Sequence, residues 1–128
     1  MTFDSIEELE KIKKWFPKAE CVLRIAVDAT TAVYNLSEKF GATMQEVPKI
    51  LDVAKKLNLH IKGVAFHTGS GGVTFSSYES SLKNIRKIFN MAKQKGLKEM
   101  DFIDIGGGFT MIYPGTGKNF NEVAPLIS

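Results

Sequence analysis

Two glycine-rich segments, residues 66–72 and 104–109, each directly follow a short apolar run of the kind that forms a β-strand. Glycine lets the backbone turn so that several N–H groups converge, and such a turn can hold an anion without a cationic side chain. A helix that begins after the turn adds the partial positive charge of its N-terminus. The repeated arrangement therefore predicts a phosphate site, and it makes the neighbouring His67 a candidate for contact with whatever the phosphate carries.

Apolar residues along the chain alternate between strand spacing and helix spacing. The pattern predicts strands at 1–3, 21–27, 61–67 and 102–105, and helices at 5–16, 31–39, 47–57 and 78–96. The first helix has Ser5 and Glu8 at the spacing of an N-terminal capping box, and it ends before Pro17. The strands are short and almost continuously apolar, as in a parallel sheet that helices cover. We therefore expect an α/β chain built from βα units, with residues 1–128 in one domain.

Two other phosphate-binding architectures fail on their residue spacing. A dinucleotide-binding fingerprint that begins with Gly106 and Gly108 has Met111 where its third glycine belongs. A P-loop fails because Lys118 is followed by Asn119 and not by serine or threonine. In a (β/α)8 barrel, by contrast, ligand-binding residues gather at the carboxyl ends of the strands, where both glycine loops fall. The pattern favours the barrel.

The chain is too short for a complete barrel. A (β/α)8 barrel typically needs about 250 residues, whereas this sequence has 128. We therefore expect a partial barrel of about four parallel strands with their connecting helices. Such a half barrel exposes strand edges and an inner face, which predicts that it belongs to a larger polypeptide or assembles with another half.

Composition argues against several other classes of protein. The chain is 44% hydrophobic and 24% charged, and its net charge of +3 comes from lysines spread over helix faces, so neither disorder nor a nucleic-acid partner is indicated. No apolar stretch approaches the roughly 20 residues of a membrane span, and the first residues lack a signal-peptide layout. We therefore expect a cytoplasmic protein without a membrane partner. Cys21, the single cysteine, is expected to be a buried apolar residue, which argues against a metal site.

Five short segments together carry a family resemblance over nearly the whole chain. They are Met1-Thr2-Phe3-Asp4-Ser5, Leu23-Arg24-Ile25-Ala26, Lys39-Phe40-Gly41-Ala42-Thr43, Phe66-His67 with Gly69-Ser70-Gly71, and Asp104-Ile105-Gly106-Gly107-Gly108-Phe109. In this order and spacing the chain resembles the ornithine decarboxylase family of pyridoxal-phosphate enzymes, whose barrel is shared with alanine racemase. The resemblance implies pyridoxal 5'-phosphate as the cofactor and an amino acid as the small-molecule substrate.

The resemblance also implies roles for individual residues. His67 would act in catalysis by stacking its ring on the pyridine ring of the cofactor. The phosphate would be bound by Ser70, Gly106, Gly107 and Gly108. Asp104 would position the triple-glycine loop. From the residues alone, a satisfied core histidine at His67 and a turn-forming hydroxyl at Ser70 remain alternatives.

The chain departs from the family pattern at two positions, and several family residues fall outside it. Gly72 and Thr110 stand where the family commonly has cysteine and proline, and neither change removes a cofactor contact. The lysine that holds the cofactor covalently is expected before this segment; the carboxylate on the pyridine nitrogen, the substrate-binding aspartate and the catalytic cysteine are expected after it. Lys62 cannot replace that lysine, because it begins its strand at the opposite end of the barrel. The segment alone is therefore expected to be inactive.

The activity that the resemblance implies is decarboxylation of ornithine to putrescine, a step of polyamine biosynthesis, by a homodimer. Two alternatives remain open. One is a related decarboxylase of arginine or diaminopimelate, because the substrate-selecting residues lie outside the chain. The other is a non-catalytic regulator of the antizyme-inhibitor type, with antizyme as its partner. The glycine-serine-glycine run at 69–71 argues against the regulator, since a protein without a cofactor does not need that loop.

A further expectation comes from strand parity. Arg24 and Asp104 lie on the second and fourth predicted strands, and alternate strands of a barrel contribute side chains to the same interior layer. We expect both to face the interior and to satisfy each other, directly or through the cofactor site, because a lone buried charge is costly. The alternative is that Arg24 serves a carboxylate outside this segment, while Asp104 only hydrogen-bonds the glycine loop.

Overall fold

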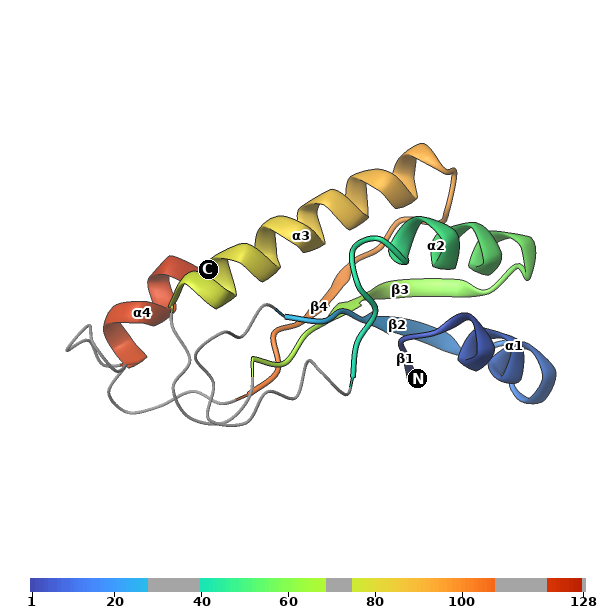
Figure 1. Cartoon of the computed structure of the whole chain (residues 1–128), viewed down its shortest axis with the longest axis horizontal. Coiled ribbons are helices and arrows are strands. Elements are labelled where there is room, and N and C mark those ends of the chain that lie inside the picture. The colour runs from blue at the N-terminus through green and yellow to red at the C-terminus, as the bar shows by residue number, and fades with distance from the viewer. Residues whose placement is uncertain (28–39, 69–74, 108–119, 128) are drawn as a thin grey trace.

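The computed structural model describes residues 1–27, 40–68, 75–107 and 120–127, which form a parallel four-stranded sheet with helices (Figure 1). The strands are β1 (Thr2–Phe3), β2 (Glu20–Arg24), β3 (His60–Ala65) and β4 (Phe102–Asp104), and they lie side by side in chain order. The helices are α1 (Ile6–Trp15), α2 (Val47–Lys56), α3 (Phe75–Gln94) and α4 (Phe120–Ile127). Consecutive parallel strands joined by helices confirm the predicted part of a (β/α)8 barrel.

Local sequence signals explain where α1 begins and which face it buries. The Ser5 side chain accepts a hydrogen bond from the Glu8 backbone N–H at 3.3 Å, so the predicted N-terminal cap is confirmed. Acidic residues occupy its first turn and basic residues its last turn, as the helix dipole favours. Leu9 and Ile12, one turn apart, are buried.

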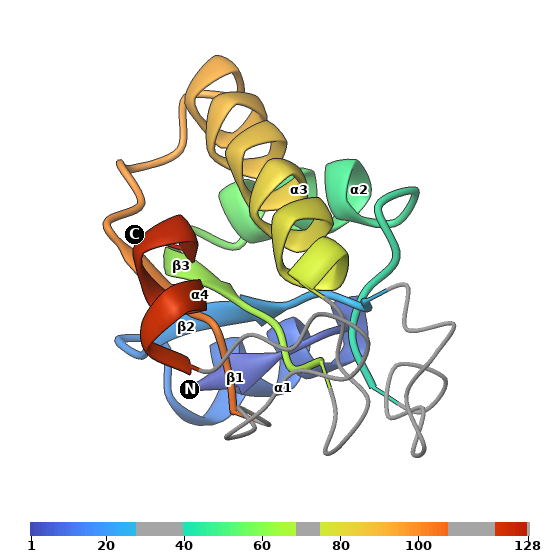
Figure 2. The same cartoon turned by 90° about the vertical axis from the view of Figure 1, so that its left-hand side faces the viewer.

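The core lies between the sheet and the helices on one of its faces. Helix α1 packs against α2 and α2 against α3, and Figures 1 and 2 show α2 and α3 together over the same side of the strands. Alternate residues of β2 and of the chain just after it point into this layer and are buried: Cys21, Leu23 and Ile25. Helices α1, α2 and α3 contribute the buried side chains of Leu9, Leu51 and Tyr78, respectively. Cys21 is fully buried, as expected, and burial raises the pKa of its thiol.

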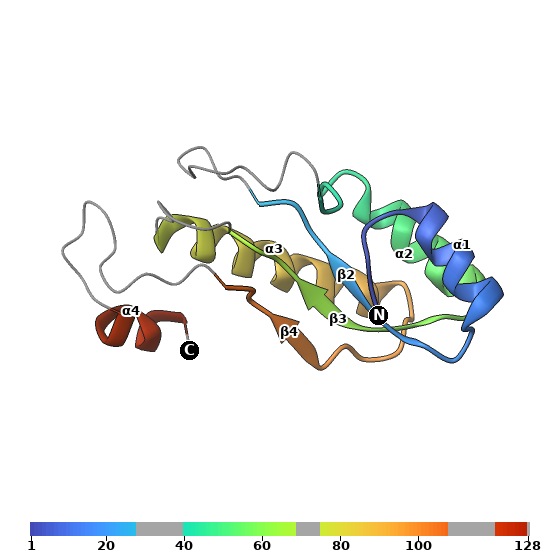
Figure 3. The same cartoon turned by 90° about the horizontal axis from the view of Figure 1, so that it is seen from below.

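The other face of the sheet is seen in Figure 3, where β2, β3 and β4 lie in front of α3. Among the described residues, the sheet ends at β1 on one side and at β4 on the other. Phe102 and Ile103 on β4 are 39% and 46% exposed. Large apolar side chains on an unpaired edge are what the half-barrel expectation requires.

The element boundaries differ from the predictions in modest ways. Helix α3 begins at Phe75, earlier than predicted, and the predicted helix at 31–39 lies outside the described residues. The sequence pattern did not predict α4. Pro125 lies inside this helix and removes one of its backbone hydrogen bonds, so the local sequence does not indicate a helix there.

Candidate functional site

The carboxyl ends of β3 and β4 bring the first residues of the two glycine-rich segments together. Beyond the paired strands, the Phe66 backbone N–H donates to the Asp104 carbonyl at 3.0 Å, which extends the pairing by one residue. The chain then continues to His67 after β3 and, through Ile105, to Gly106 and Gly107 after β4. His67 and the start of the triple-glycine loop are therefore neighbours, as the carboxyl-edge prediction required.

The loop at Gly106 fits only glycine, for two reasons. Its φ of +69° lies in the left-handed region that other residues rarely adopt. A β-carbon there would also lie 2.5 Å from the Phe66 carbonyl oxygen and 3.1 Å from Cδ2 of His67. At Gly107 a β-carbon would lie 3.6 Å from Nε2 of His67. The imidazole ring therefore lies close to the main chain of the two glycines.

Asp104 shapes this turn. Its Oδ1 atom accepts a hydrogen bond from the Gly106 backbone N–H at 2.8 Å, the local bond by which aspartate commonly stabilises a turn. The Gly106 N–H is therefore already engaged, and the contribution of Gly106 to an anion site is the turn itself. The expected positioning role of Asp104 matches this contact.

Two consecutive hydrogen bonds connect the glycine turn to the core. The Thr68 hydroxyl donates to the Tyr78 hydroxyl at 3.3 Å, and the Tyr78 hydroxyl donates to the Gly107 carbonyl at 3.3 Å. Thr68 and Tyr78 are 2% and 0% exposed. The sequence pattern placed Tyr78 only on the apolar stripe of a helix. The signal that could have indicated more is that a buried tyrosine hydroxyl usually requires a hydrogen-bond partner.

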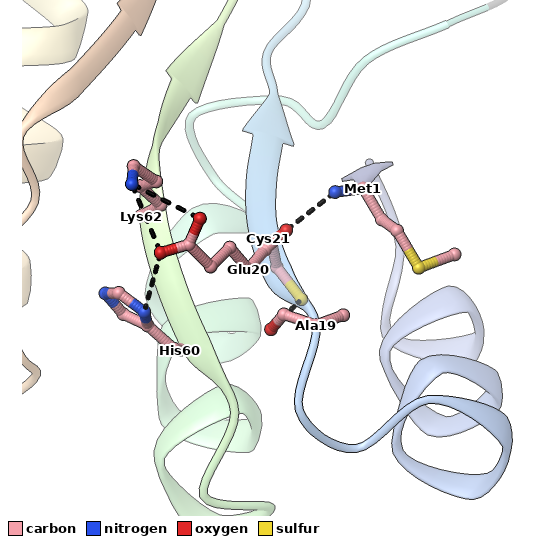
Figure 4. A network of polar contacts seen from close by, with 6 residues as sticks. All are labelled: Met1, Ala19, Glu20, Cys21, His60 and Lys62. Atoms are coloured by element: carbon pink, nitrogen blue, oxygen red, sulfur yellow. Dashed lines mark hydrogen bonds and ion pairs between the residues drawn. The ribbon is translucent and has the colours of Figure 1, made fainter.

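A separate polar group lies at the opposite end of the strands (Figure 4). Nζ of Lys62 donates to the two carboxylate oxygens of Glu20 at 3.1 and 3.2 Å, and His60 Nδ1 lies 4.0 Å from Oε1 of Glu20. The hydrogen bond and positive charge of Lys62 lower the pKa of the Glu20 carboxyl. Lys62 is thus engaged at the amino end of the sheet, in agreement with the prediction that it does not serve the site.

Arg24 and Asp104 share a level of the sheet without contacting each other. Arg24 pairs with Ala65 and Ala65 pairs with Asp104, so both charged residues lie on one face, as the parity argument predicted. Two strand spacings, about 10 Å, separate their backbones. Within the part of the chain that is described, no direct ion pair joins them: the Arg24 guanidinium lies 5.2 Å from the centre of the Phe40 ring, and Asp104 bonds Gly106. The structure therefore agrees with the alternative expectation, in which Asp104 hydrogen-bonds the glycine loop and does not pair with Arg24.

The structure thus brings together His67, Gly106 and Gly107 of the predicted site residues. Ser70 and Gly108, like Gly72 and Thr110, lie outside the described residues. Across the four described ranges, no cluster of three or more His, Cys, Asp or Glu side chains is placed to hold a metal ion. None of the helices in those ranges has the length and apolar character to cross a membrane.

The fold and the site together define a class of protein. The chain forms part of a (β/α)8 barrel, and His67 and the glycine turn make a candidate phosphate-binding site at the carboxyl edge of its strands. The chain belongs to the pyridoxal-dependent decarboxylase family, because the family's model for the pyridoxal binding domain matches residues 1–128. Its cofactor is therefore pyridoxal phosphate. The planar ring of His67 and the glycine turn at Gly106 and Gly107 fit a ligand with a flat ring and an anionic group.

Curated relatives agree with this family. The chain is 46% identical over 110 residues to a probable ornithine decarboxylase of Dictyostelium discoideum, which covers 86% of the chain and 24% of the relative. It is 43% identical over 131 residues to mouse ornithine decarboxylase, covering 100% of the chain and 27% of the relative. It is also 40% identical over 131 residues to antizyme inhibitor 2 of Xenopus laevis, covering 100% and 28%. The chain therefore spans about a quarter of the length of these relatives.

Solved structures show the same fold. The arginine decarboxylase of Paramecium bursaria Chlorella virus, bound to agmatine, matches with a TM-score of 0.86 and 34% identity over 98% of this chain and 34% of that one. Ornithine decarboxylase of Entamoeba histolytica matches with a TM-score of 0.79 and 33% identity, covering 98% and 32%. SrLDC in complex with PLP and cadaverine matches with a TM-score of 0.74 and 34% identity, covering 98% and 30%.

Proposed function

We propose that this chain is the cofactor-binding part of an ornithine decarboxylase that forms putrescine in polyamine biosynthesis. The observation that carries the proposal is the His67 ring lying against the Gly106–Gly107 turn at the carboxyl edge of the sheet. Ornithine is favoured as the substrate because the curated ornithine decarboxylases are 39–46% identical to this chain.

The residues of this chain have distinct tasks in the proposal. When bound, pyridoxal phosphate accepts the electron pair that remains on the substrate's α-carbon after carbon dioxide leaves. His67 lies along the cofactor ring, restrains its tilt and keeps water from that face. Ser70, Gly107 and Gly108 hold the phosphate, and Gly106 makes the turn that Asp104 stabilises. Main-chain and hydroxyl donors suit this task, because hydrogen bonds to a charged acceptor are stronger than neutral ones.

Decarboxylation by the full-length protein that carries this chain tests the proposal. We expect carbon dioxide release from ornithine at a higher kcat/KM than from arginine, lysine or diaminopimelate. We expect His67→Ala to lower kcat by about 10- to 100-fold, the size of the loss when a group that orients the reacting ring is removed. His60→Ala is the matched control, because the chain's other histidine lies at the amino end of β3. Equal loss in both variants would contradict the role of His67.

A second candidate function is regulation without catalysis, and the similarity to an antizyme inhibitor favours it. A full-length protein of that kind would bind antizyme but would neither bind pyridoxal phosphate nor release carbon dioxide from ornithine. The glycine-serine-glycine run at 69–71 supports the enzyme, since a protein without a cofactor does not need that loop. Equilibrium dialysis with pyridoxal phosphate separates the two candidates.

The proposal includes two properties of the full-length protein, a homodimer and a cytoplasmic location. Both follow from the expectations drawn from the sequence. Light scattering of the purified protein tests the first, and a monomer at assay concentration would contradict it. Fractionation of cells that express the full-length protein tests the second.

A further inference from the structure

Tyr78 joins three segments that are distant in the sequence. It lies in the first turn of α3, its side chain is fully buried, and its ring meets the Phe66 ring edge-to-face at 5.9 Å and 67°. Its hydroxyl accepts a hydrogen bond from Thr68, which follows β3, and donates one to the carbonyl of Gly107, which follows β4. One side chain on α3 therefore connects both loops at the carboxyl edge.

The bond to Gly107 restrains the orientation of the Gly107 carbonyl group. A carbonyl oxygen is a hydrogen-bond acceptor without a donor, so it repels an anion that it faces. A carbonyl held toward the core by Tyr78 is kept from turning toward an anion at the loop. Glycine alone would not keep this orientation, because its backbone has the greatest conformational freedom of all residues.

The Thr68 hydroxyl orients the Tyr78 hydroxyl in turn. A tyrosine hydroxyl has a single proton, so accepting from Thr68 leaves that proton available for Gly107. The ring contact with Phe66 restrains the tyrosine ring itself. Both features fix the direction of the donated bond.

We propose that Tyr78 is a positioning residue for the cofactor phosphate, which it affects through the carbonyl group of Gly107. The inference rests on the proposed function, because it requires a cofactor whose phosphate meets this loop. A purely structural tyrosine would stabilise the core without distinguishing a ligand that has a phosphate from one that lacks it. The comparison of pyridoxal phosphate with pyridoxal therefore isolates the positioning role.

The experiment uses the full-length protein freed of cofactor and measures the dissociation constants of pyridoxal phosphate and pyridoxal by equilibrium dialysis. We expect Tyr78→Phe to weaken binding of pyridoxal phosphate by about three- to tenfold, the effect of one hydrogen bond, and to leave pyridoxal binding unchanged. Thr68→Val should act in the same direction by a smaller factor, since it removes only the orienting bond. Ser81→Ala, which deletes another buried hydroxyl from α3, is the matched control and should change neither constant.

The outcomes separate the two proposals. If the unmodified protein binds pyridoxal phosphate tightly and Tyr78→Phe binds it equally well, or weakens both ligands by the same factor, the positioning role is wrong and the proposed function stands. If the unmodified protein does not bind pyridoxal phosphate, both are wrong. Thermal unfolding of the cofactor-free variants shows whether they are folded. If the Tyr78→Phe protein is not folded, the binding constants of Thr68→Val test the positioning role instead.

Discussion

Gly63 on β3 lies so close to Phe102 on β4 that a β-carbon at Gly63 would fall 1.8 Å from the Phe102 carbonyl oxygen. The two residues are register partners, and the glycine turn of the candidate site begins only four residues after Phe102. The position of β4, and with it that of the turn, therefore depends on the absence of a side chain at Gly63.

Gly63→Ala should push β4 away from β3. We expect the free energy of unfolding of the full-length protein to fall by about 1–3 kcal/mol, the usual cost of overpacking, and cofactor binding to weaken as the turn moves. Urea unfolding measures the first effect and equilibrium dialysis the second. Gly107→Ala is the control for stability, because its added carbon would meet His67 at an ordinary contact distance of 3.6 Å. A fully stable Gly63→Ala protein would contradict the prediction.

Asp104→Ala should loosen the glycine turn. The substitution removes the carboxylate that accepts from the Gly106 N–H at 2.8 Å. We expect pyridoxal phosphate to bind about three- to tenfold more weakly, as for the loss of one hydrogen bond. Asp104→Asn keeps an acceptor oxygen and should restore most of the affinity. If the alanine variant binds as tightly as the unmodified protein, the side chain does not shape the site.

Ser70→Ala tests a residue that lies outside the described ranges, so its role is still a prediction from the sequence. Loss of a hydrogen bond to a charged phosphate costs about 1.5–3 kcal/mol, which corresponds to a roughly 10- to 100-fold weaker affinity for the cofactor. Titration of the cofactor-free full-length protein measures the change. Ser80→Ala, an exposed serine of α3, is the control. Unchanged affinity in a folded Ser70→Ala protein would exclude Ser70 from the phosphate site.

The Glu20–Lys62 pair should give a pH-dependent contribution to stability. Lys62 lowers the pKa of Glu20 below its ordinary value of 4.5. Because the folded-state pKa is the lower one, the pair stabilises the fold above about pH 4.5, and this contribution is lost as the pH falls through the lowered pKa. Lys62→Met should raise the Glu20 pKa in a side-chain NMR titration. Lys11→Met, which removes the partner of Glu8 on α1, should leave it unchanged.

The 128-residue chain by itself should show no ornithine decarboxylation. Its described residues supply four parallel strands, whereas a (β/α)8 barrel closes with eight. Borohydride reduction in the presence of pyridoxal phosphate, followed by peptide mapping, should find no specific covalent adduct. One stoichiometric adduct on a single lysine of this chain would contradict the expectation.

The sequence predicted those features that depend on repeated spacing or on the ends of strands. Periodic apolar residues indicated the four strands and helices α1, α2 and α3. His67 and Gly106 could be placed together because the carboxyl ends of parallel strands meet at one edge. Parity also placed Arg24 and Asp104 on the same face of the sheet.

The sequence pattern did not decide whether Arg24 and Asp104 pair directly or whether Asp104 only hydrogen-bonds the glycine loop. Parity alone does not indicate whether two side chains on alternate strands can reach each other. In the structure, Asp104 bonds the nearby Gly106 N–H and Arg24 lies over Phe40. The hydroxyl contact of Tyr78 was equally hidden, because helical spacing shows which side of a helix is buried but not which atom its polar tip meets.

The turn at Gly106 and Gly107 is held from both sides by the protein itself, by the carboxylate of Asp104 and the hydroxyl of Tyr78. A run of glycines without such bonds would sample many conformations and would lose that entropy whenever a ligand ordered it. Here the ordering of these two residues takes place when the chain folds. An anion that reaches the loop therefore meets a preorganised turn, and more of its interaction energy remains as affinity.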